Sequence, residues 1–516
     1  MPTNHISTDE TEQAHDVVRH GRLSGTRNAD IASLLSSMEA DRYIASHDVR
    51  VDIAHLLMLA DCSITSRPHA QKLMRELIQL YDEGVPQSVF NPAYEDIHAG
   101  IESHIIAMIG MDSGGRLHVA RSRNDEVATC LRLYARSAAL AQIESLLALR
   151  LLLLELAQEH LQTIMPGFTH LQHAQPTTLA HHMLAYEQMF ARDTNRLLCA
   201  YEHINASPLG AAAFASTGYP IDREQTSRDL GFQTIVENSM DAVSSRDFAC
   251  ELLSADTILE MHISRLCEEL IIWNSGLTRF VELDDAYCST SSIMPQKKNP
   301  DVAELLRSRT GTLLGAFTSA ITIMKALPLT YNRDLQDLNP HLFSGTKHIA
   351  RDLRLLAGML QTAKFQKERM HAQAGEGYST ATGLADYLVC VYDIPFREAH
   401  NIIGRAVRAD SLQLQTLDLA AQEITGHTLS EKGLTKEEID RVLDPAYSVS
   451  SRSNFGGPAP SAVKQALKHR KEIVKQHSTE FFALSQNVSR AEETLIEKAR
   501  QFIQENKENH AEHKTD

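Results

Sequence analysis

Residues 291–301 read SSIMPQKKNPD. This stretch predicts both a helix start and a polar loop in front of it. Asparagine is a favoured N-cap, proline suits the first helical position, and acids suit the first turn. The stretch therefore predicts a helix that begins at Asn299 and continues through VAELLRSRTGTLL. Its paired serines and paired lysines lie in the preceding loop, and a loop above a helix N-terminus can bind carboxylate or phosphate. A simple capping loop explains Asn299 and Pro300 but neither pair, so a functional loop is favoured.

A second motif, HVARSRNDE at residues 118–126, opens a long helical pattern. Arg121 and Arg123 precede an Asn-Asp cap, so cations and free backbone N–H groups converge here as well. The planar guanidinium of arginine suits two-pronged binding of a carboxylate. The alternative is a surface cluster of salt bridges at a helix start, which would contribute little to stability.

A third motif, MPGFTHLQHAQP at residues 165–176, ends in a proline that predicts another helix start at Pro176. His170 and His173, with His181 and His182 further on, raise the hypothesis of a metal site. Their spacing matches no known metal-binding pattern, and no acidic or cysteine ligand accompanies them, so we predict no metal. A single histidine in a loop is usually structural.

The three motifs share one property, because each precedes a predicted helix N-terminus. Between them they carry arginine, histidine, serine and lysine side chains. One such place is common in proteins, whereas three on different helices predict a composite site that holds a dianion and moves a proton.

The helical patterns divide the chain into three predicted domains, at residues 1–120, 121–370 and 371–516. The first has a polar arm and short helices separated by breakers at Arg67-Pro68, Gly84-Val85-Pro86 and Asn91-Pro92. The second has long helical patterns at about 125–163, 176–205, 245–280, 300–326 and 340–365. The third has shorter patterns, a break at 456–460, a charged helical pattern after Ala462 and a polar tail.

Helices of this length predict an all-α fold. Residues 246–280 as one helix would extend about 50 Å, at ~1.5 Å per residue. One small core cannot bury five such helices, so we expect a long central five-helix bundle that packs against copies of itself. We expect the final charged helix to dock on the protein, with a coiled-coil arm as the alternative.

Composition narrows the class of protein. The chain has 516 residues, a net charge of −16, 43% hydrophobic and 22% charged residues, which is typical of a soluble globular protein and argues against a nucleic-acid or anionic-membrane surface. Seven scattered cysteines without a CxxC pair argue against a disulfide framework. The polar N-terminus shows no secretory signal, and the apolar stretch at 146–157 is too short and too charged to span a membrane. A cytoplasmic location is therefore expected.

The motif at 291–301 resembles the signature loop of the fumarase/aspartase superfamily, and its PQKKNPD half resembles that of the argininosuccinate lyases. The SRND and Thr-His-Leu-Gln segments and Gly21-Arg22 resemble the same family, over about residues 15–465. The resemblance implies a three-domain fold with a 20-helix core in a homotetramer, and active sites shared between three subunits. It also implies reversible β-elimination of argininosuccinate to L-arginine and fumarate, the last step of arginine biosynthesis, with no metal or organic cofactor.

The resemblance also implies roles for individual residues. Ser291 matches the general base that removes a proton beside a carboxylate, and Lys297 matches the lysine that stabilises the resulting dianion. His170 matches the histidine of the acid–base network, with Glu304 as its carboxylate partner, and the acid is either His170 or a water that it orients. The matched substrate contacts are Ser37, His98, Arg123, Asn124, Thr169, Ser292, Asn299, Tyr331 and Gln336.

Two positions depart from the family pattern. Thr290 stands where many members have glycine, which stiffens a loop expected to close over substrate. Asn339 stands where bacterial and animal members carry a lysine, and its surroundings (DLQDLNPHLF) resemble the archaeal type. The sequence therefore leaves open which amine is the leaving group. A sister carbon–nitrogen lyase on another N-substituted succinate, such as an ethylenediamine-disuccinate lyase, is the alternative. An inactive structural protein is a third possibility, and the intact catalytic set argues against it.

Overall fold

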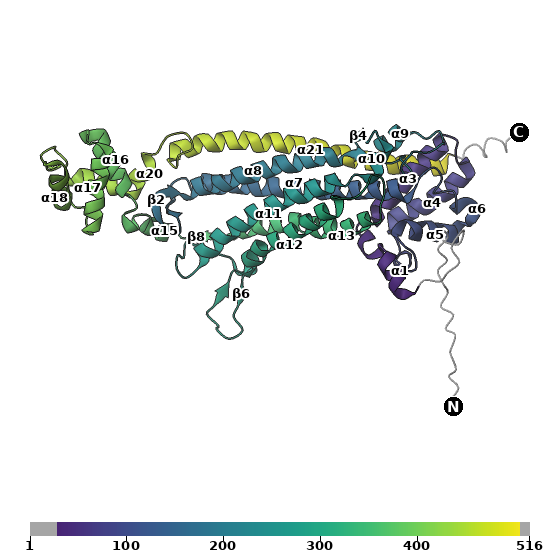
Figure 1. Cartoon of the computed structure of the whole chain (residues 1–516), viewed down its shortest axis with the longest axis horizontal. Helices are drawn as coiled ribbons and strands as arrows, with labels where there is room; N and C mark the ends of the chain where they lie inside the picture. Colours follow the sequence, from purple (N-terminus) through teal and green to yellow (C-terminus); the bar gives the residue numbers. More distant parts are fainter. Residues whose placement is uncertain (1–27, 506–516) are drawn as a thin grey trace, which may run out of the picture.

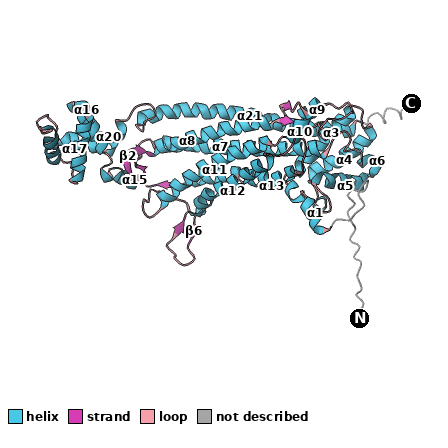
Figure 2. Cartoon of the chain, viewed as in Figure 1, coloured by secondary structure: helices cyan, strands magenta, loops and turns pink. Residues whose placement is uncertain are grey.

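The computed structural model describes residues 28–505, and almost all of its regular structure is helical (Figures 1 and 2). The predicted polar arm, with Gly21 and Arg22, lies almost wholly outside these residues, as does the C-terminal tail. Within them the chain forms one elongated molecule, with the long helices side by side along its length (Figure 1).

Short helices make up the N-terminal end of the molecule, as the breakers predict. Pro68 lies in the first turn of α4, and Gly84, with a φ of +83°, ends the same helix. The conformation at Gly84 is one that other residues rarely adopt, which explains the glycine. The elements are α1 (Ala29–Leu35), α2 (Met38–Asp41), α3 (Ala45–Asp61), α4 (Arg67–Glu83), the 3-10 turn η2 (Gln87–Val89), α5 (Ile97–Ile109) and α6 (Met111–Gly114).

Long helices form the central bundle. They are α7 (Arg123–Glu159), α8 (Leu179–Ile204), α11 (Asp247–Asn274), α12 (Asp301–Met324), α13 (Asp334–Thr346) and α14 (Ile349–Thr362). In this bundle α7 packs on α8 and α14, α8 packs on α11, and α12 packs on α11 and α13. The predicted fifth helix at 340–365 is wrong in its extent. Two helices, α13 and α14, occupy this region and are separated at Lys347-His348, and α13 begins before Pro340 and continues through it.

α7 shows why the second motif starts a helix. Ser122 is its N-cap, and the side chains of Ser122 and Asp125 form a capping box that satisfies free N–H groups of the first turn. The predicted Asn-Asp cap is therefore two residues late. By length and composition α7 could cross a membrane. Its apolar residues are instead buried against α8, α14 and α21, so this helix belongs to the core of the bundle.

Four two-stranded sheets interrupt the helices. They are β1 (Ile164–Thr169) with β2 (Gln172–Thr178), β3 (Ala206–Ser207) with β4 (Thr234–Ile235), β5 (Val281–Glu282) with β8 (Lys364–Phe365), and β6 (Ser289–Thr290) with β7 (Lys298–Asn299). The pair β3–β4 is parallel and the other pairs are antiparallel. Short elements connect them: α9 (Arg223–Asp229), α10 (Ser239–Ser244) and η3 (Asp285–Tyr287).

The β1–β2 and β6–β7 hairpins correct two predicted helix starts. Pro176 lies in β2 opposite Pro166, and α8 begins at Leu179 with Thr178 as its cap. Proline lacks an N–H group, which a two-stranded hairpin tolerates on its outer edge. Asn299 lies in β7 rather than at a helix cap, and α12 begins at Asp301 after Pro300.

The C-terminal part contains a second apolar core. It is built from α16 (Ala381–Tyr392), α17 (Phe396–Arg408), α18 (Leu414–Thr425) and α19 (Lys436–Leu443), flanked by α15 (Lys367–Ala374), η4 (Glu376–Tyr378) and α20 (Pro445–Ser450). The last helix, α21 (Pro460–Gln504), then returns along the bundle and contacts α7, α8, α3 and α4 (Figure 1). It is docked, and its buried residues join the main core. The domain boundaries at 120 and 370 stay predictions.

Candidate active site

A cavity of about 110 Å³ lies where the beginnings of α2, α5, α7 and α13 meet. It brings together residues that are far apart in the sequence and that were all predicted as substrate contacts: Ser37, His98, Arg123, Asn124, Tyr331 and Gln336. Helix starts supply several of these positions. Arg123 is the first residue of α7, and Ser37 is the N-cap residue of α2. Side-chain caps occupy N–H groups at two of these helix starts, from Ser122 and Asp125 at α7 and from Asp96 at α5.

Carboxylates also line this cavity, and the sequence analysis did not single them out. Asp41 accepts a hydrogen bond from the Ser37 hydroxyl at 2.6 Å, and burial raises the pKa of Asp41 to about 6. Asp96 accepts one from Arg123 Nη1 at 2.6 Å, and Glu95 lies 3.7 Å from the same nitrogen. Glu95 and Asp96 stand in the run EDIHAGIE at residues 95–102, so the acids beside His98 were a signal that could have identified them.

His98 links the cavity to a buried network of charges. Its Nδ1 lies 2.8 Å from Asp48 and 3.6 Å from Glu126, while its Nε2 has no hydrogen-bond partner. Burial alone would lower the pKa of His98, but the carboxylates of Asp48 and Glu126 raise it well above its usual range. Arg121 pairs with Glu126 at 3.0 Å and with Asp52. Of the two arginines in the second motif, Arg121 is thus a buried structural partner, and Arg123 faces the cavity.

The same network contains side chains that can bind metal ions. Asp48, His98 and Cys130 offer ligand atoms that all lie within 4.8 Å of one another. The guanidinium of Arg121 already balances neighbouring carboxylates, however, and burial together with Asp48 raises the pKa of the Cys130 thiol well above its usual range. A metal needs the thiolate, which this environment disfavours. The donor set fits a metal poorly, and we assign none.

The signature loop joins β6 to β7 and protrudes from the bundle (Figure 1). The Ser291 hydroxyl accepts hydrogen bonds from the backbone N–H groups of Ile293 at 3.3 Å and Met294 at 3.0 Å. Two N–H dipoles aimed at one oxygen favour negative charge on it. Ser292 is exposed at the loop surface, and the side chain of Ile293 is 82% exposed.

The two lysines of this loop differ in their surroundings. Lys298 donates to the Leu283 carbonyl at 2.5 Å and pairs with Asp285 at 2.6 Å, so it fastens the base of the loop. Lys297 is exposed and makes no ion pair with any residue in the range 28–505. Only Lys297 is therefore available to a ligand. Asn299, in β7, is half-buried.

The β1–β2 hairpin carries the third motif at its tip. Thr169 pairs with Gln172, so His170 and Leu171 form a two-residue turn with φ values of 56° and 57°. Such a turn normally contains asparagine and glycine, because other residues are strained there. Thr169 and His170 are exposed, and the side chain of Leu171 is 74% exposed.

A single chain does not bring together the hairpin tip, the signature loop and the cavity, which are called the three groups below. The hairpin lies at one end of the bundle, the signature loop projects beside the start of α12 nearer to that end, and the cavity lies toward the other end, beside α5 and α13 (Figure 1). Glu304 is exposed on α12, and His170 and Glu304 form no ion pair or hydrogen bond with each other. The predicted residues that lie outside the cavity are Thr169, His170, Ser291, Ser292, Lys297, Asn299 and Glu304.

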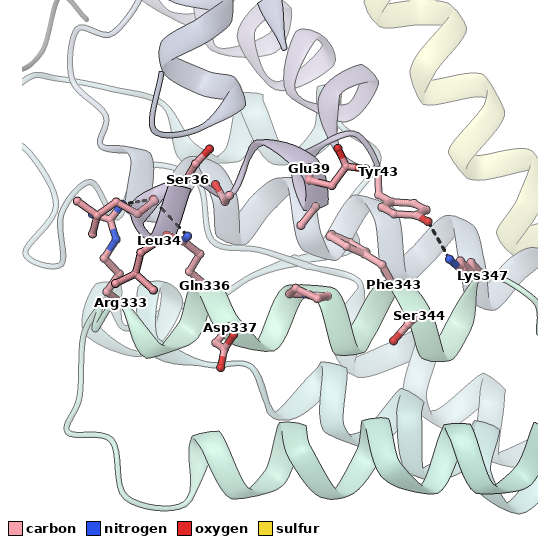
Figure 3. A pocket seen from close by; sticks show the side chains of 14 residues that line it. Leu34, Ser36, Glu39, Tyr43, Arg333, Gln336, Asp337, Phe343, Ser344 and Lys347 are labelled. Carbon is pink, nitrogen blue, oxygen red and sulfur yellow. Dashed lines mark hydrogen bonds between the residues drawn. The ribbon is translucent and has the colours of Figure 1, made fainter. Parts of the chain in front are cut away.

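A larger groove adjoins the cavity and shares Ser37, Arg333 and Gln336 with it. It has a volume of about 690 Å³ and runs between α1–α2 and α13 (Figure 3). Arg333 Nη2 donates to the Leu35 carbonyl at 2.6 Å and so joins α1 to the segment before α13. The groove gives the cavity an open side toward solvent.

Comparison with known proteins gives matches over nearly the whole chain. A family model described as lyase matches residues 27–315, and one described as argininosuccinate lyase C-terminal matches residues 378–450. The argininosuccinate lyase of Methanospirillum hungatei is 58% identical over 95% of this chain and 99% of that protein. The argininosuccinate lyase of Methanoculleus marisnigri is 52% identical over 94% of this chain and 99% of that protein.

Solved structures confirm the predicted all-α fold class. EDDS lyase in complex with formate superposes with a TM-score of 0.81 at 29% identity, over 93% of this chain and 97% of that chain. A class II fumarase from Schistosoma mansoni gives a TM-score of 0.65 at 16% identity, over 79% of this chain and 90% of that chain, and shows the fold alone.

Proposed function

Because this chain belongs to the argininosuccinate lyase family of carbon–nitrogen lyases, we propose that it cleaves argininosuccinate to fumarate and L-arginine. The reaction is reversible, needs no metal or organic cofactor, and is the last step of arginine biosynthesis in the cytoplasm. The observation that carries this proposal is Ser291. Its hydroxyl receives two backbone N–H groups in an exposed loop that also presents Lys297.

The chemistry begins with removal of a proton from the carbon next to a carboxylate of the succinate half. Ser291 takes this proton, and the electron pair moves into the carboxylate to form a dianion beside Lys297. Cations and N–H dipoles aimed at that charge lower the barrier. The electron pair then forms the double bond of fumarate while the C–N bond breaks. The leaving guanidino nitrogen keeps the bonding electrons and takes a proton from His170 or from a water that His170 orients.

The two halves of the substrate meet different side chains. Thr169, Ser292 and Asn299 bind the succinate half, close to Ser291. The cavity binds the amine half, because acids (Asp41, Glu95 and Asp96) and arginines (Arg123 and Arg333) both line it, which suits a group with an ammonium and a carboxylate. Its predicted contacts Ser37, His98, Arg123, Asn124, Tyr331 and Gln336 position that half, and Arg123 is held in place by Asp96.

A homotetramer supplies the complete site, with three subunits contributing the signature loop, the hairpin tip and the cavity. The position of the three groups in Figure 1 supports this proposal, since they are separated along one chain. α12 supports it as well. Leu314 and Ile321 are exposed on one side of this helix, and a Cβ added at Gly311 or Gly315 would meet no other atom. Small and apolar residues on an open helix side are suited to close packing with another helix. Across such an interface, Glu304 of one subunit partners His170 of another.

An ultraviolet assay for fumarate tests the proposed function, because the conjugated double bond of fumarate absorbs where the substrate does not. We expect rapid release from argininosuccinate and none from ethylenediamine-disuccinate or other N-substituted succinates. Release from ethylenediamine-disuccinate alone would favour the sister lyase, with which the chain shares 29% identity. A correctly assembled protein that releases fumarate from no adduct would indicate the structural role instead.

A further inference from the structure

Asp125, in the first turn of α7, is a fully buried carboxylate that accepts hydrogen bonds from three backbone N–H groups. Its Oδ1 accepts from Ser122 at 3.0 Å, which completes the capping box of the helix. Its Oδ2 accepts from Gly210 at 2.9 Å and from Ala212 at 2.8 Å, which lie 85 and 87 residues further along the chain. The cap uses Oδ1 alone, so the two bonds to Oδ2 join a distant segment to the start of α7.

That distant segment is a tight turn at residues 209–213, called the 209–213 turn below. Gly210 and Ala212 have φ values of +90° and +51°, in the left-handed region that residues with a side chain rarely adopt. A backbone of this kind persists where surrounding contacts hold it. Arg223 supplies one such contact, because its Nε donates to a carbonyl of the turn at 2.9 Å. Asp125 supplies two more.

The turn belongs to an excursion of the chain between α8 and α11, at residues 205–246. α7 also holds the two ends of this excursion. Arg132 Nη1 donates to the Ile204 carbonyl at 3.2 Å, and Arg132 Nη2 donates to the Ser245 hydroxyl at 3.1 Å. Asp125 extends this attachment to the first turn of α7, which is the part of the helix that borders the cavity.

The 209–213 turn contacts a side chain that lines the cavity. Asn124 Nδ2 donates to the Ala213 carbonyl at 3.0 Å, and Asn124 is one of the proposed substrate contacts. The oxygen of an amide whose nitrogen is held in this way remains free to accept a hydrogen bond from a ligand. Ala213 directly follows Ala212, whose N–H group Asp125 holds. The position of the carbonyl that orients Asn124 therefore depends on Asp125.

We propose that Asp125 is a positioning residue for the lyase reaction, which holds the 209–213 turn so that the Ala213 carbonyl keeps the Asn124 amide oriented toward substrate. This inference rests on the proposed function and deepens it, because Asp125 acts through a substrate contact and does not touch the substrate itself. Burial raises the pKa of the Asp125 carboxyl to about 6, against the three N–H groups that lower it. At pH 7.5 the group is therefore ionised, and both oxygens can accept.

Asp125→Asn is the informative substitution, because asparagine has the same shape but lacks the charge and one acceptor oxygen. We expect KM for argininosuccinate at pH 7.5 to rise about 10-fold, within the range for a lost hydrogen bond to a charged group. The change in kcat should be much smaller. In an Asn124→Ala background the same substitution should raise KM less than about twofold, because two residues that act through one contact are not additive.

Gly210→Ala tests the same connection from the other side. A Cβ atom at this position would lie 2.5 Å from Arg223 Cγ, so the turn must shift, while the capping box of α7 stays intact. We expect a rise in KM with a small change in kcat, and again almost no further rise in the Asn124→Ala background. If Asp125→Asn does not fold, this pair of variants decides the question by the same criterion.

Asp222→Asn is the matched control. Asp222 lies in the same excursion and also accepts a hydrogen bond from a backbone N–H, that of Gln225 at 2.9 Å, but it lies outside the cavity lining. Its substitution should leave KM unchanged. Thermal unfolding of all variants shows how much of any loss comes from a less stable fold.

An unchanged KM in Asp125→Asn would overturn the inference while the lyase function stood. An equal rise in KM with and without Asn124 would overturn it as well, because a purely structural residue affects both backgrounds alike. The proposed function is tested separately, by fumarate release in the natural protein. If that protein acts on another adduct, the same four KM values are measured with that adduct.

Discussion

At the scale of single residues, Ser291 is defined by the backbone around it. A serine hydroxyl is a weak base in water, and its ionisation at neutral pH requires groups that favour the alkoxide. The N–H groups of Ile293 and Met294 already point at this oxygen. Lys297 is free to approach it when the loop meets the rest of the site, whereas Lys298 is tied to Asp285.

We therefore predict that Ser291→Ala lowers kcat by roughly a thousandfold or more, the upper range for a lost general base. Binding of fumarate and assembly should be retained, because the two N–H groups can bond to water instead. Steady-state kinetics and a fumarate titration measure both effects. Cys288→Ala is the control, since Cys288 lies in the same loop region and outside the proposed site, and its kcat should not change. A near-normal rate in Ser291→Ala would contradict its role as base.

Leu171 shows a different residue-scale effect. A left-handed conformation costs about 1–2 kcal/mol for a residue with a side chain, and Leu171 adopts it next to His170 at an exposed tip. Strain of this kind is retained where the fold over-determines it, often at functional sites. The turn leaves His170 exposed at the tip, as the proposed shared site requires.

At the scale of elements, the sequence predicted helices well and hairpins poorly. α7 was recognisable because its capping residues and long apolar pattern agree. β1–β2 was not, because Pro176 is equally compatible with a helix start and with the outer edge of a hairpin. The same ambiguity placed a helix cap at Asn299.

The candidate site shows the same division between local and long-range information. Its motif residues were identified from residue types and spacing within short segments, which do not depend on contacts with distant parts of the chain. Asp41 and Arg333 were not identified, since their place beside Ser37 depends on how α2 packs against α13. Packing between distant segments also decides which of Arg121 and Arg123 is buried in an ion pair and which faces the cavity. Local patterns carry no information about such contacts.

α21 is fastened to the bundle by a pH-sensitive contact. Arg150 of α7 donates to His477 Nδ1 at 2.8 Å, and Glu187 of α8 accepts from Arg150 at 3.0 Å and from Arg470 at 2.5 Å. Burial lowers the pKa of His477, and the two arginines lower it further, against a smaller opposing effect of Glu187. His477 is therefore neutral in the folded protein, as its role as acceptor requires.

The sign of the pH effect follows from this lowered pKa. Below about pH 6.5, the usual pKa of histidine, the unfolded chain binds a proton at His477 that the folded protein does not. The contribution of His477 to stability is therefore present above that pH and is lost as the pH falls. We predict that His477→Gln, which keeps an acceptor but does not titrate, reduces the fall in Tm between pH 7.5 and 5.5.

Thermal melts at the two pH values measure this difference directly. His469→Gln is the matched control, because His469 is exposed on the same helix two turns away, and it should leave the pH dependence unchanged. An identical fall in Tm for the natural protein and His477→Gln would show that this contact does not hold α21 in place.

At the scale of the whole molecule, the separation of the three groups predicts complementation between defective chains. Ser291→Ala and His170→Asn each remove one required group, and each variant should be inactive alone. In a mixed assembly some sites combine an intact Ser291 from one chain with an intact His170 from another. With random exchange in a 1:1 mixture, about one quarter of the sites are complete.

Fumarate release after exchange of subunits measures the recovery. Exchange must be confirmed independently, for example by mass spectrometry of the intact assemblies. Recovery near one quarter of the natural activity is expected. If confirmed mixed assemblies stay inactive, the hairpin tip and the signature loop of one site belong to the same chain.

The distance between the signature loop and the cavity has a further consequence for how the enzyme behaves when it is scarce. A catalyst whose parts lie on one chain keeps its specific activity on dilution. In the proposed homotetramer each chain carries only fragments of a site, so turnover per chain should decline steeply once the concentration drops below the dissociation constant of the assembly. Substrate that bridges two chains would oppose this decline, and a cell that makes too little of the protein would lose more flux than the shortfall in protein alone suggests.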